Sequence, residues 1–298
     1  MKNDYRQLLQ PQIINSVSGL ALIARVVVDT FLAGAHQSRR VGSGLEFSQY
    51  RGYQPGDDMR LLDWKMLARS GRYYIKESDI DTHVTVKFII DTSASMLHEE
   101  DGVSKIDYVR VLVASLAYLS QNQGDSVGLF ALNNVNLQSL FPSSNKKHYN
   151  RLLHELVHMK IGGVWPSDQN DLDKIHQRTQ KELLFLVTDM HENNAELTNW
   201  VQSLKTSKNE VCVLHVLGKN EIMFDYKGAI VFEDLETGKK VKVNAKNAKG
   251  AYLAAMQRNL KEIKEAFLSK DIGYELFRLD RPIEEALQFF LKKRASLS

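Results

Sequence analysis

Cysteine is almost absent from this chain of 298 residues, because Cys212 is the only one. A single cysteine excludes an intramolecular disulfide, so the chain is not one of the small secreted domains that disulfides hold together. Cys212 lies within an apolar run at residues 211–214, where a small buried side chain is expected. This use of cysteine is compatible with a cytoplasmic location, which we expect.

Long hydrophobic runs free of charge are also lacking. Polar residues interrupt the first twelve positions, so no secretory signal is predicted. The segment at 13–35 comes nearest to a membrane span, yet Asn15, Arg25 and Asp29 within it are costly inside a bilayer. Helical spacing groups its apolar residues on one broad side, namely Leu20, Leu22, Ile23, Val26 and Val27. We expect an amphipathic helix packed on the protein itself, with attachment to a membrane surface as the alternative.

A strong excess of one charge is missing as well. Lysine and arginine number 39 against 36 aspartate and glutamate residues, which gives a formal net charge of +3. Nucleic-acid-binding domains concentrate basic residues more strongly, and the most basic stretch, residues 292–294, is typical of a solvated helix end. No nucleic-acid partner is therefore expected. A Gly-x-x-x-x-Gly-Lys loop is absent, so the chain is not expected to hydrolyse ATP itself.

Strand-like and helix-like segments alternate through the middle of the chain. Continuous apolar runs predict buried strands at 84–90, 126–132, 183–188 and 211–217. The stretches between and after them predict helices at 106–121, 147–159, 171–180 and 195–207. This alternation predicts an α/β fold with a doubly wound, mostly parallel sheet covered by helices on both faces.

The pattern changes after Gly218 and before residue 80. A hairpin is predicted from strands at 230–232 and 240–243, followed by a helix at 248–269, a strand at 274–279 and a last helix from Pro282 to residue 293. The first 80 residues are irregular and rich in turns. We therefore expect an N-terminal segment, 1–80, packed on the core, and a domain at 81–298 with a hairpin elaboration near 222–247.

Polar side chains follow two of the predicted buried strands. The motif Asp-x-Ser-x-Ser at 91–95 comes directly after the first, and Asp189 follows the third. Ligands of open α/β sheets bind beyond the carboxyl ends of the strands, where the strand order reverses. Carboxylate and hydroxyl oxygens suit a hard cation such as Mg²⁺. The sequence therefore predicts a metal site formed by Asp91, Ser93, Ser95 and Asp189.

Helix capping is the alternative role for the same residues. Ser93 and Ser95 have hydroxyls that can accept backbone N–H groups of a following helix. Asp189 can do the same for a helix that begins near Asn194. The residues alone leave the metal site and the caps equally open.

A resemblance to known families bears on this choice. The motif at 91–95 together with Asp189 resembles the metal-ion-dependent adhesion site of von Willebrand factor A domains. Longer blocks resemble the family called domain of unknown function 58: GLEF (44–47), RGYQPGDDMR (51–60), LDW (62–64), AR (68–69), IIDTSASM (89–96) and EDLETG (233–238). The resemblance covers nearly the whole chain and implies a sheet of von Willebrand factor A type.

The resemblance also implies a class of function. Members that resemble this chain are thought to act as adaptors or assembly factors and tend to be linked with MoxR-type AAA+ ATPases. The implied cofactor is Mg²⁺, with Mn²⁺ or Ca²⁺ as alternatives, and the implied activity is metal-dependent binding of a protein partner. Some members carry transmembrane helices, whereas no such segment is predicted here. No residue is expected to be catalytic, and the residues that would bind a partner are not identified.

One position departs from the family pattern. The von Willebrand factor A site takes a threonine ligand from a loop that here contains Gly162, Gly163 and Val164. Val164 has no oxygen in its side chain, so the ion should be bound more weakly or keep an open coordination position. Ser167 or Asp168 offers a substitute oxygen, although a serine before a predicted helix is also an ordinary N-cap.

A magnesium-dependent hydrolase is the rival function. A phosphatase of haloacid-dehalogenase type would use Asp91 as nucleophile and Asp189 to hold the metal. Such enzymes need an aspartate two positions after the nucleophile, and Ser93 stands there. A Gly-x-Ser-x-Gly motif is also absent. We therefore expect a protein that is not an enzyme.

Several further residues have both a functional and a structural interpretation. Charges alternate between Arg51 and Arg72, which indicates a docking face or, more simply, internal ion pairs. Trp64 in this block is expected to be a core anchor. His154 and His158 have the spacing of a two-histidine metal site but are more simply helix-surface residues. His191 lies two residues after Asp189, where a solvated loop histidine is common.

Overall fold

A computed structural model describes residues 9–39, 50–54, 62, 64–76, 83–167, 175, 182–192 and 195–295. The chain forms two compact units, one with Met1–Phe31 and His83–Leu297 and the other with Leu32–Thr82. The segment expected as one N-terminal piece, 1–80, is thus divided between the two. The candidate site lies entirely in the first unit.

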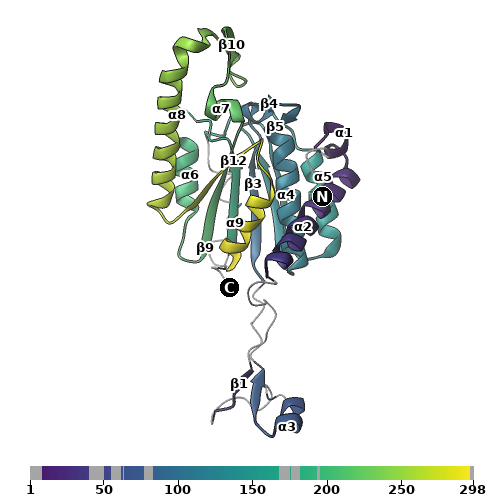
Figure 1. Ribbon diagram of the computed structural model, residues 1–298. Helices are drawn as coiled ribbons and strands as arrows, with labels where there is room; N and C mark the ends of the chain where they lie inside the picture. Colours follow the sequence, from purple (N-terminus) through teal and green to yellow (C-terminus); the bar gives the residue numbers. More distant parts are fainter. Residues whose placement is uncertain are drawn as a thin grey trace. The chain divides into compact units, whose positions relative to one another are not determined.

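A six-stranded sheet forms the centre of the first unit (Figure 1). Its strand order is β12-β9-β8-β3-β6-β7, and every neighbouring pair is parallel except β6 with β7. The strand bounds are β3 (Thr85–Asp91), β6 (Ser126–Leu132), β7 (Leu137–Ser143), β8 (Glu182–Thr188), β9 (Asn209–Leu217) and β12 (Gly273–Arg278). The sheet is the doubly wound, mostly parallel one that the apolar runs predict.

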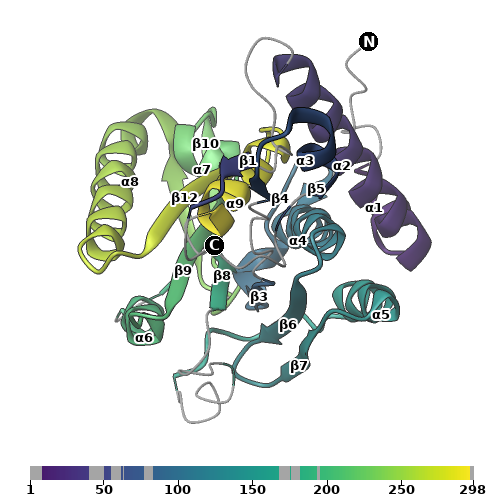
Figure 2. The same cartoon turned by 90° about the horizontal axis from the view of Figure 1, so that it is seen from below.

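Helices cover both faces of this sheet (Figure 2). On one side lie α4 and α5, and on the other lie α6 and α8, where Trp200 and Phe267 pack into a buried core with Ile89 of β3. The helix bounds are α1 (Pro11–Ile14), α2 (Val17–Arg39), α4 (Lys105–Asn122), α5 (Lys146–Val157), α6 (Glu196–Leu204), α8 (Ala245–Leu268) and α9 (Glu284–Ala295). The helix expected at 171–180 lies outside the described residues, apart from Ile175.

The order of the strands reverses between β3 and β8. From β3 the chain continues to β6 on one side, and from β8 it continues to β9 on the other. The loops that leave these two strands therefore diverge, and a crevice opens at their carboxyl ends. Asp91 ends β3 and Asp189 directly follows β8, so both lie at this switch point.

The amphipathic helix expected near the N-terminus is present as α2. Leu20, Ile23 and Val27 are fully buried, whereas Arg25 and Asp29 are exposed. Leu22 was expected on the buried side but is exposed, because it lies about 200° around the helix from Leu20, on the opposite side. Among the described residues, no helix is long and apolar enough to cross a membrane.

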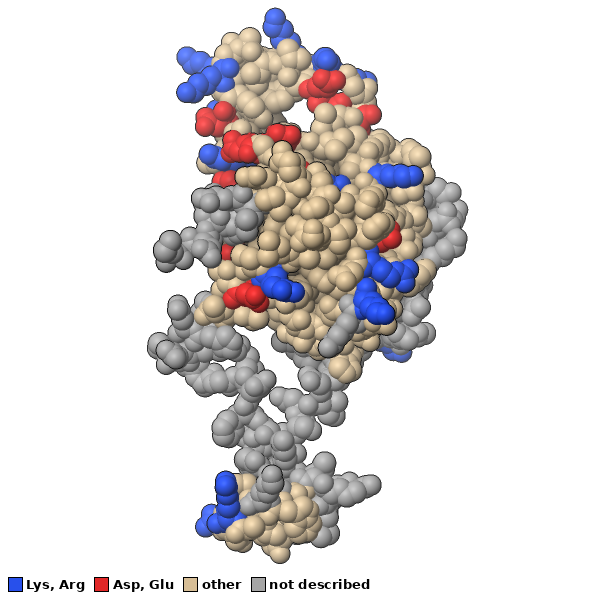
Figure 3. All heavy atoms as spheres, turned by 90° about the vertical axis from the view of Figure 1, so that its right-hand side faces the viewer, with Lys and Arg blue, Asp and Glu red and all other residues tan. Residues whose placement is uncertain are grey.

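The predicted hairpin near 222–247 is formed by β10 (Ala229–Glu233) and β11 (Lys240–Asn244), which pair antiparallel. The preceding α7 (Lys219–Met223) ends at Phe224, which is buried and packs against Tyr226, Phe232 and Tyr252 of α8. Figure 3 shows basic and acidic side chains at the hairpin, at the top of the view. One such pair is Lys240 with Glu233, at 3.1 Å.

The second unit is described by itself. It contains the antiparallel strands β1 (Tyr50–Gly52) and β2 (Tyr74–Lys76) and the helix α3 (Trp64–Ser70). Trp64 is 61% exposed, so the expectation of a core anchor is wrong. A two-stranded ribbon with a seven-residue helix offers too little apolar surface to cover an indole. Asp57, Asp58 and Asp63 of the alternating charges lie outside the described residues.

We expect the thiol of Cys212 to be unreactive in the native protein. Cys212 is fully buried in β9, and burial raises its pKa to about 12. The thiolate fraction at pH 8 is then lower by about a thousandfold than for an exposed cysteine, even before access is considered. Labelling with a chromogenic disulfide reagent should be at least about a hundredfold slower in buffer than in urea. Similar rates in the two conditions would contradict the buried position.

Candidate metal centre

Asp91 ends β3 and is completely buried. Its Oδ1 accepts a hydrogen bond from the backbone N–H of Ser93 at 2.9 Å. Its Oδ2 accepts one from the hydroxyl of Thr188, the last residue of β8, at 2.7 Å. The register of β3 and β8 therefore fixes the carboxylate at the edge where the two strands end.

The two serines of the motif face each other and Asp189. Ser93 Oγ lies 2.9 Å from Ser95 Oγ, and the Ser95 hydroxyl donates to Asp189 Oδ1 at 3.1 Å. The structure therefore brings together all four residues that the sequence predicts as a site. Their role as metal ligands stays a prediction.

The capping alternative does not describe this geometry. Ser93 precedes the short 3₁₀ helix η3 (Ala94–Leu97), but its side chain makes no capping hydrogen bond. Helix α6 begins after Ala195, whose side chain cannot cap it. Asp189 instead contacts Ser95, Lys105 and the backbone N–H of His191.

The loop with the missing threonine runs beside the motif, as the resemblance implies. Gly162 donates its N–H to Thr92 O, and Gly163 O accepts the N–H of Ala94, both at 2.9 Å. Gly163 has a φ of 70°, and a Cβ there would meet Asn134 Oδ1 at 2.1 Å, so only glycine fits. Val164 is 36% exposed and offers no side-chain oxygen. Ser167 is exposed, and Asp168 lies outside the described residues.

A buried lysine also belongs to the site. Lys105 begins α4, is 2% exposed, and lies 2.8 Å from both Asp189 Oδ2 and Glu221 Oε1. Burial lowers the pKa of Lys105, but the carboxylates of Asp189 and Glu221 raise it more, so its pKa lies above the ordinary value. Burial raises the pKa of Asp189, but Lys105 lowers it more, so Asp189 is ionised.

Asp91 carries the unbalanced charge of the site. Burial, and then the negative charge of Asp189, raise the pKa of Asp91 to about 6, although the hydrogen bonds from Ser93 and Thr188 oppose this. Two carboxylates and two hydroxyls with excess negative charge form the all-oxygen set that Mg²⁺ prefers. The residues present therefore fit the ion. Among the described residues, no cluster of three or more His, Cys, Asp or Glu side chains has metal-binding geometry.

A buried histidine fixes the position of Asp189. His215 of β9 places Nε2 3.0 Å from Asp189 O and Nδ1 2.7 Å from the hydroxyl of Tyr274. A carbonyl oxygen only accepts, so Nε2 carries the proton and Nδ1 accepts from Tyr274. Burial lowers the pKa of His215 to about 4, so the ring is neutral at pH 7. His215 thus holds the loop that carries Asp189 without adding charge.

Glu236, at the tip of the β10–β11 hairpin, reaches the same site. Its Oε2 lies 3.7 Å from His191 Nε2, and its side chain is only 5% exposed. Burial raises the pKa of Glu236, His191 lowers it, Asp189 raises it and the Ser95 hydroxyl lowers it, with a net rise. The hairpin tip is therefore part of the candidate centre.

Sequence reasoning missed five residues of this centre: Thr188, Lys105, Glu221, His215 and Glu236. Thr188 could have been identified from the sequence, because it directly precedes Asp189 at the end of a predicted strand. Glu236 was noted only as part of the block at 233–238. The other three are brought in by the fold from α4, α7 and β9.

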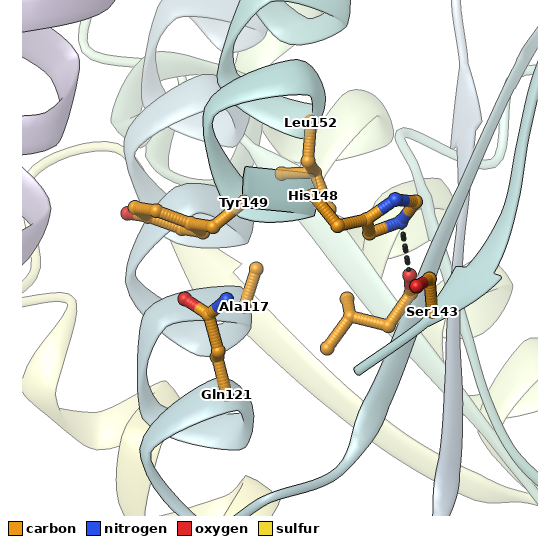
Figure 4. Close-up of a pocket in the computed structure, with 7 residues that line it drawn as sticks. Ala117, Gln121, Ser143, His148, Tyr149 and Leu152 are labelled. Carbon is orange, nitrogen blue, oxygen red and sulfur yellow. Dashed lines mark hydrogen bonds between the residues drawn. The ribbon is translucent and has the colours of Figure 1, made fainter. Parts of the chain in front are cut away.

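Two other candidate features lie away from this centre. His154 and His158 stack at the end of α5 with ring centroids 4.1 Å apart, and within the described part of the chain the acidic side chain beside them is Glu155, 3.8 Å from His154 Nδ1. A small hollow lies between α4, α5 and β6, where His148 contacts Val127 O at 2.8 Å (Figure 4). Its volume of about 10 Å³ suits one water molecule.

Comparisons with known proteins identify a family and relatives of the chain. Residues 49–262 match the family described as "Protein of unknown function DUF58". The uncharacterized protein Rv1480 of Mycobacterium tuberculosis is 23% identical over 233 residues, which cover 76% of this chain and 72% of that protein. The uncharacterized protein Mb1516 of Mycobacterium bovis has the same identity and coverage.

Solved structures with a similar fold include von Willebrand factor A domains. BatB of Bacteroides thetaiotaomicron has 13% identity and a TM-score of 0.45, covering 72% of this chain and 99% of that chain. The SpRpn10 VWA domain has 11% identity and a TM-score of 0.42, covering 70% and 95%. The strand order and the family match, rather than these weak likenesses, carry the assignment. The fold is of the von Willebrand factor A type that the resemblance implied.

Proposed function

The chain belongs to the family "Protein of unknown function DUF58", and from this premise and the site geometry we propose a non-enzymatic, metal-dependent protein-binding adaptor or assembly factor. Its proposed partner is a MoxR-type AAA+ ATPase, as the family resemblance implies. The proposal places the protein in the cytoplasm, in keeping with its single buried cysteine.

The convergence of four oxygen-bearing residues at the strand ends carries the proposal. Asp91, Ser93, Ser95 and Asp189 would hold Mg²⁺, with Asp189 bound directly or through water. Mn²⁺ or Ca²⁺ would use the same oxygens. The bound ion supplies a positive charge and a coordination position for a carboxylate oxygen of the partner. The negative charge shared by Asp91 and Asp189 supports a cation at this position.

The environment of Asp91 supports a binding role over the rival hydrolase. The side chain is fully buried, and both carboxylate oxygens accept hydrogen bonds within the protein. A carboxylate nucleophile must let a substrate atom approach to about 3–3.5 Å, which the complete burial of Asp91 opposes, whereas each oxygen keeps a lone pair for a small ion. Ser93, at the place of the acid/base aspartate, has a hydroxyl that points to Ser95.

We expect Asp91→Asn to lose binding to the MoxR-type ATPase of the same organism, with an affinity at least about tenfold lower in Mg²⁺. Asparagine is isosteric with aspartate: its oxygen can accept the Ser93 N–H, and its NH₂ group can donate to the Thr188 hydroxyl in place of accepting from it, so the fold should be retained. Surface plasmon resonance with the purified ATPase would measure the loss. The ATPase itself uses Mg²⁺ with ATP, so the variant, and not chelation alone, isolates the adaptor's own site.

The matched control is Asp225→Asn, because Asp225 is exposed and has no role in the centre. It should bind the ATPase as the wild type does. Equal binding by Asp91→Asn and the wild type in Mg²⁺ would rule out the metal-gated mechanism. An ATPase that binds neither protein would remove the proposed partner.

A further inference from the structure

The hairpin tip brings a third carboxylate to the candidate centre. Glu236 lies between β10 and β11, more than forty residues after Asp189 in the sequence. Its pKa responds to Asp189, Ser95 and His191, and its Oε2 lies 3.7 Å from His191 Nε2. The side chain therefore points from the hairpin toward the motif and not into solvent.

One oxygen of this carboxylate has no partner among the described residues. Oε1 of Glu236 is buried and accepts no hydrogen bond, while the whole side chain is 95% buried. Burying a carboxylate oxygen without a compensating donor or cation is costly, and native proteins rarely leave one so. The nearby basic groups leave Oε1 without a donor: Lys105 is held by Asp189 and Glu221, and His191 lies beside the other oxygen, Oε2, at 3.7 Å. An ion bound at the centre would satisfy this oxygen.

The position of Glu236 is built into the hairpin. Asp234 Oδ1 accepts the backbone N–H groups of Glu236 and Thr237 at 2.9 and 3.2 Å, which fixes the turn. The backbone N–H of Asp234 also donates a hydrogen bond to Lys239 O, at 2.9 Å. Phe224 and its aromatic neighbours hold the base of the hairpin against α8. The turn thus holds the backbone of Glu236 in place before the ion binds, so little conformational entropy of the backbone is lost when the carboxylate meets the ion.

Although no three acidic or histidine side chains among the described residues are already arranged to hold a metal ion, we propose that Glu236 turns onto the ion as a ligand in cis, which supplies an oxygen to a site that lacks the threonine at Val164. This inference rests on the proposed metal centre and adds a ligand that the motif does not contain. The hairpin tip then occupies the position that a partner's carboxylate would take. A partner must displace Glu236 to bind the ion, so the hairpin closes the site until a partner opens it.

Mn²⁺ binding to the full chain tests the proposal without any partner. Glu236→Gln should lower the affinity for Mn²⁺ by about tenfold or more, because a charged ligand becomes a neutral one. Glu233→Gln is the matched control, since Glu233 lies in the same hairpin, is half exposed and forms its ion pair, as far as the described residues go, with Lys240. That control should stay within about twofold of the wild type. Electron paramagnetic resonance of free Mn²⁺ gives the affinities.

Water proton relaxation of bound Mn²⁺ gives an independent readout. If Glu236 is a ligand, Glu236→Ala should let water take its place, and the relaxivity per bound ion should rise above that of the wild type. The turn itself is held by Asp234, whose Oδ1 accepts the backbone N–H groups of residues 236 and 237, so the shorter side chain should leave the rest of the hairpin intact. A purely structural role for Glu236 would change stability but not the number of waters on the ion.

The outcomes separate this inference from the proposed function. Mn²⁺ binding that is lost in Asp91→Asn but unchanged, with unchanged relaxivity, in both Glu236 variants would overturn the inference alone. No Mn²⁺ binding by the wild type would overturn the metal centre and the inference together. Weaker binding and higher relaxivity in the Glu236 variants, with Glu233→Gln unaffected, is the result that the inference predicts.

Discussion

Lys105→Met should lower the free energy of unfolding by about 3–5 kcal/mol in metal-free buffer. The Lys105 ammonium lies 2.8 Å from Asp189 Oδ2 and 2.8 Å from Glu221 Oε1, at 2% exposure. Methionine keeps most of the side-chain volume but leaves the buried Asp189 without its cation. Urea denaturation in EDTA measures this loss.

Mg²⁺ should restore part of the stability lost in this variant. In this variant a bound cation would balance the negative charge of Asp189, which Lys105 balances in the wild type. Without Lys105, both oxygens of Asp189 are available to the cation. The stabilisation that Mg²⁺ gives at a fixed concentration should therefore be larger in Lys105→Met than in the wild type. Lys240→Met is the control, because the Lys240–Glu233 pair is exposed and should contribute less than about 1 kcal/mol. An equal stabilisation by Mg²⁺ of Lys105→Met and of the wild type would contradict a cation site beside Asp189.

Lys87→Met should destabilise the protein by a similar amount, about 3–5 kcal/mol, for a reason unrelated to the metal. Lys87 lies inside β3, with Nζ 2.5 Å from Glu182 Oε1 and 2.9 Å from Ile175 O. The two side chains are 3% and 0% exposed, so the variant leaves a buried carboxylate. Urea denaturation should show the loss in EDTA and in Mg²⁺ alike.

A double variant tests the cause of this effect. Lys87→Met with Glu182→Leu removes both charges, so much of the lost stability should return. If Lys87→Met alone is as stable as the wild type, the buried ion pair is not the reason for the lysine. If Mg²⁺ rescues Lys87→Met as strongly as Lys105→Met, the rescue of Lys105→Met is not specific to the centre.

The central strands could be predicted because each is a continuous apolar run. Strands β3, β6, β8 and β9 are almost wholly buried, and burial on both faces removes the alternation of an exposed strand. Strand β7 could not be predicted in this way. It lies at the sheet edge, its burial is irregular, and Pro142 within it argues against a central strand.

The candidate centre was predictable only where its residues are close in sequence or end a strand. Asp91, Ser93 and Ser95 form a local motif, and Asp189 follows from the rule that parallel strands end at one edge. Lys105 begins a helix and Glu236 lies in a turn, where charged residues are ordinarily solvated. Only the placement of α4 and the hairpin around β3 and β8 brings these charges to the centre.

Isothermal titration calorimetry with Mg²⁺ tests the central claim most directly. We predict that the wild-type chain binds one Mg²⁺ and that Asp91→Asn, with an unchanged unfolding transition, loses this binding. Absence of Mg²⁺ binding by the wild type, or equal binding by the folded variant, would show that Asp91, Ser93, Ser95 and Asp189 do not form a metal centre.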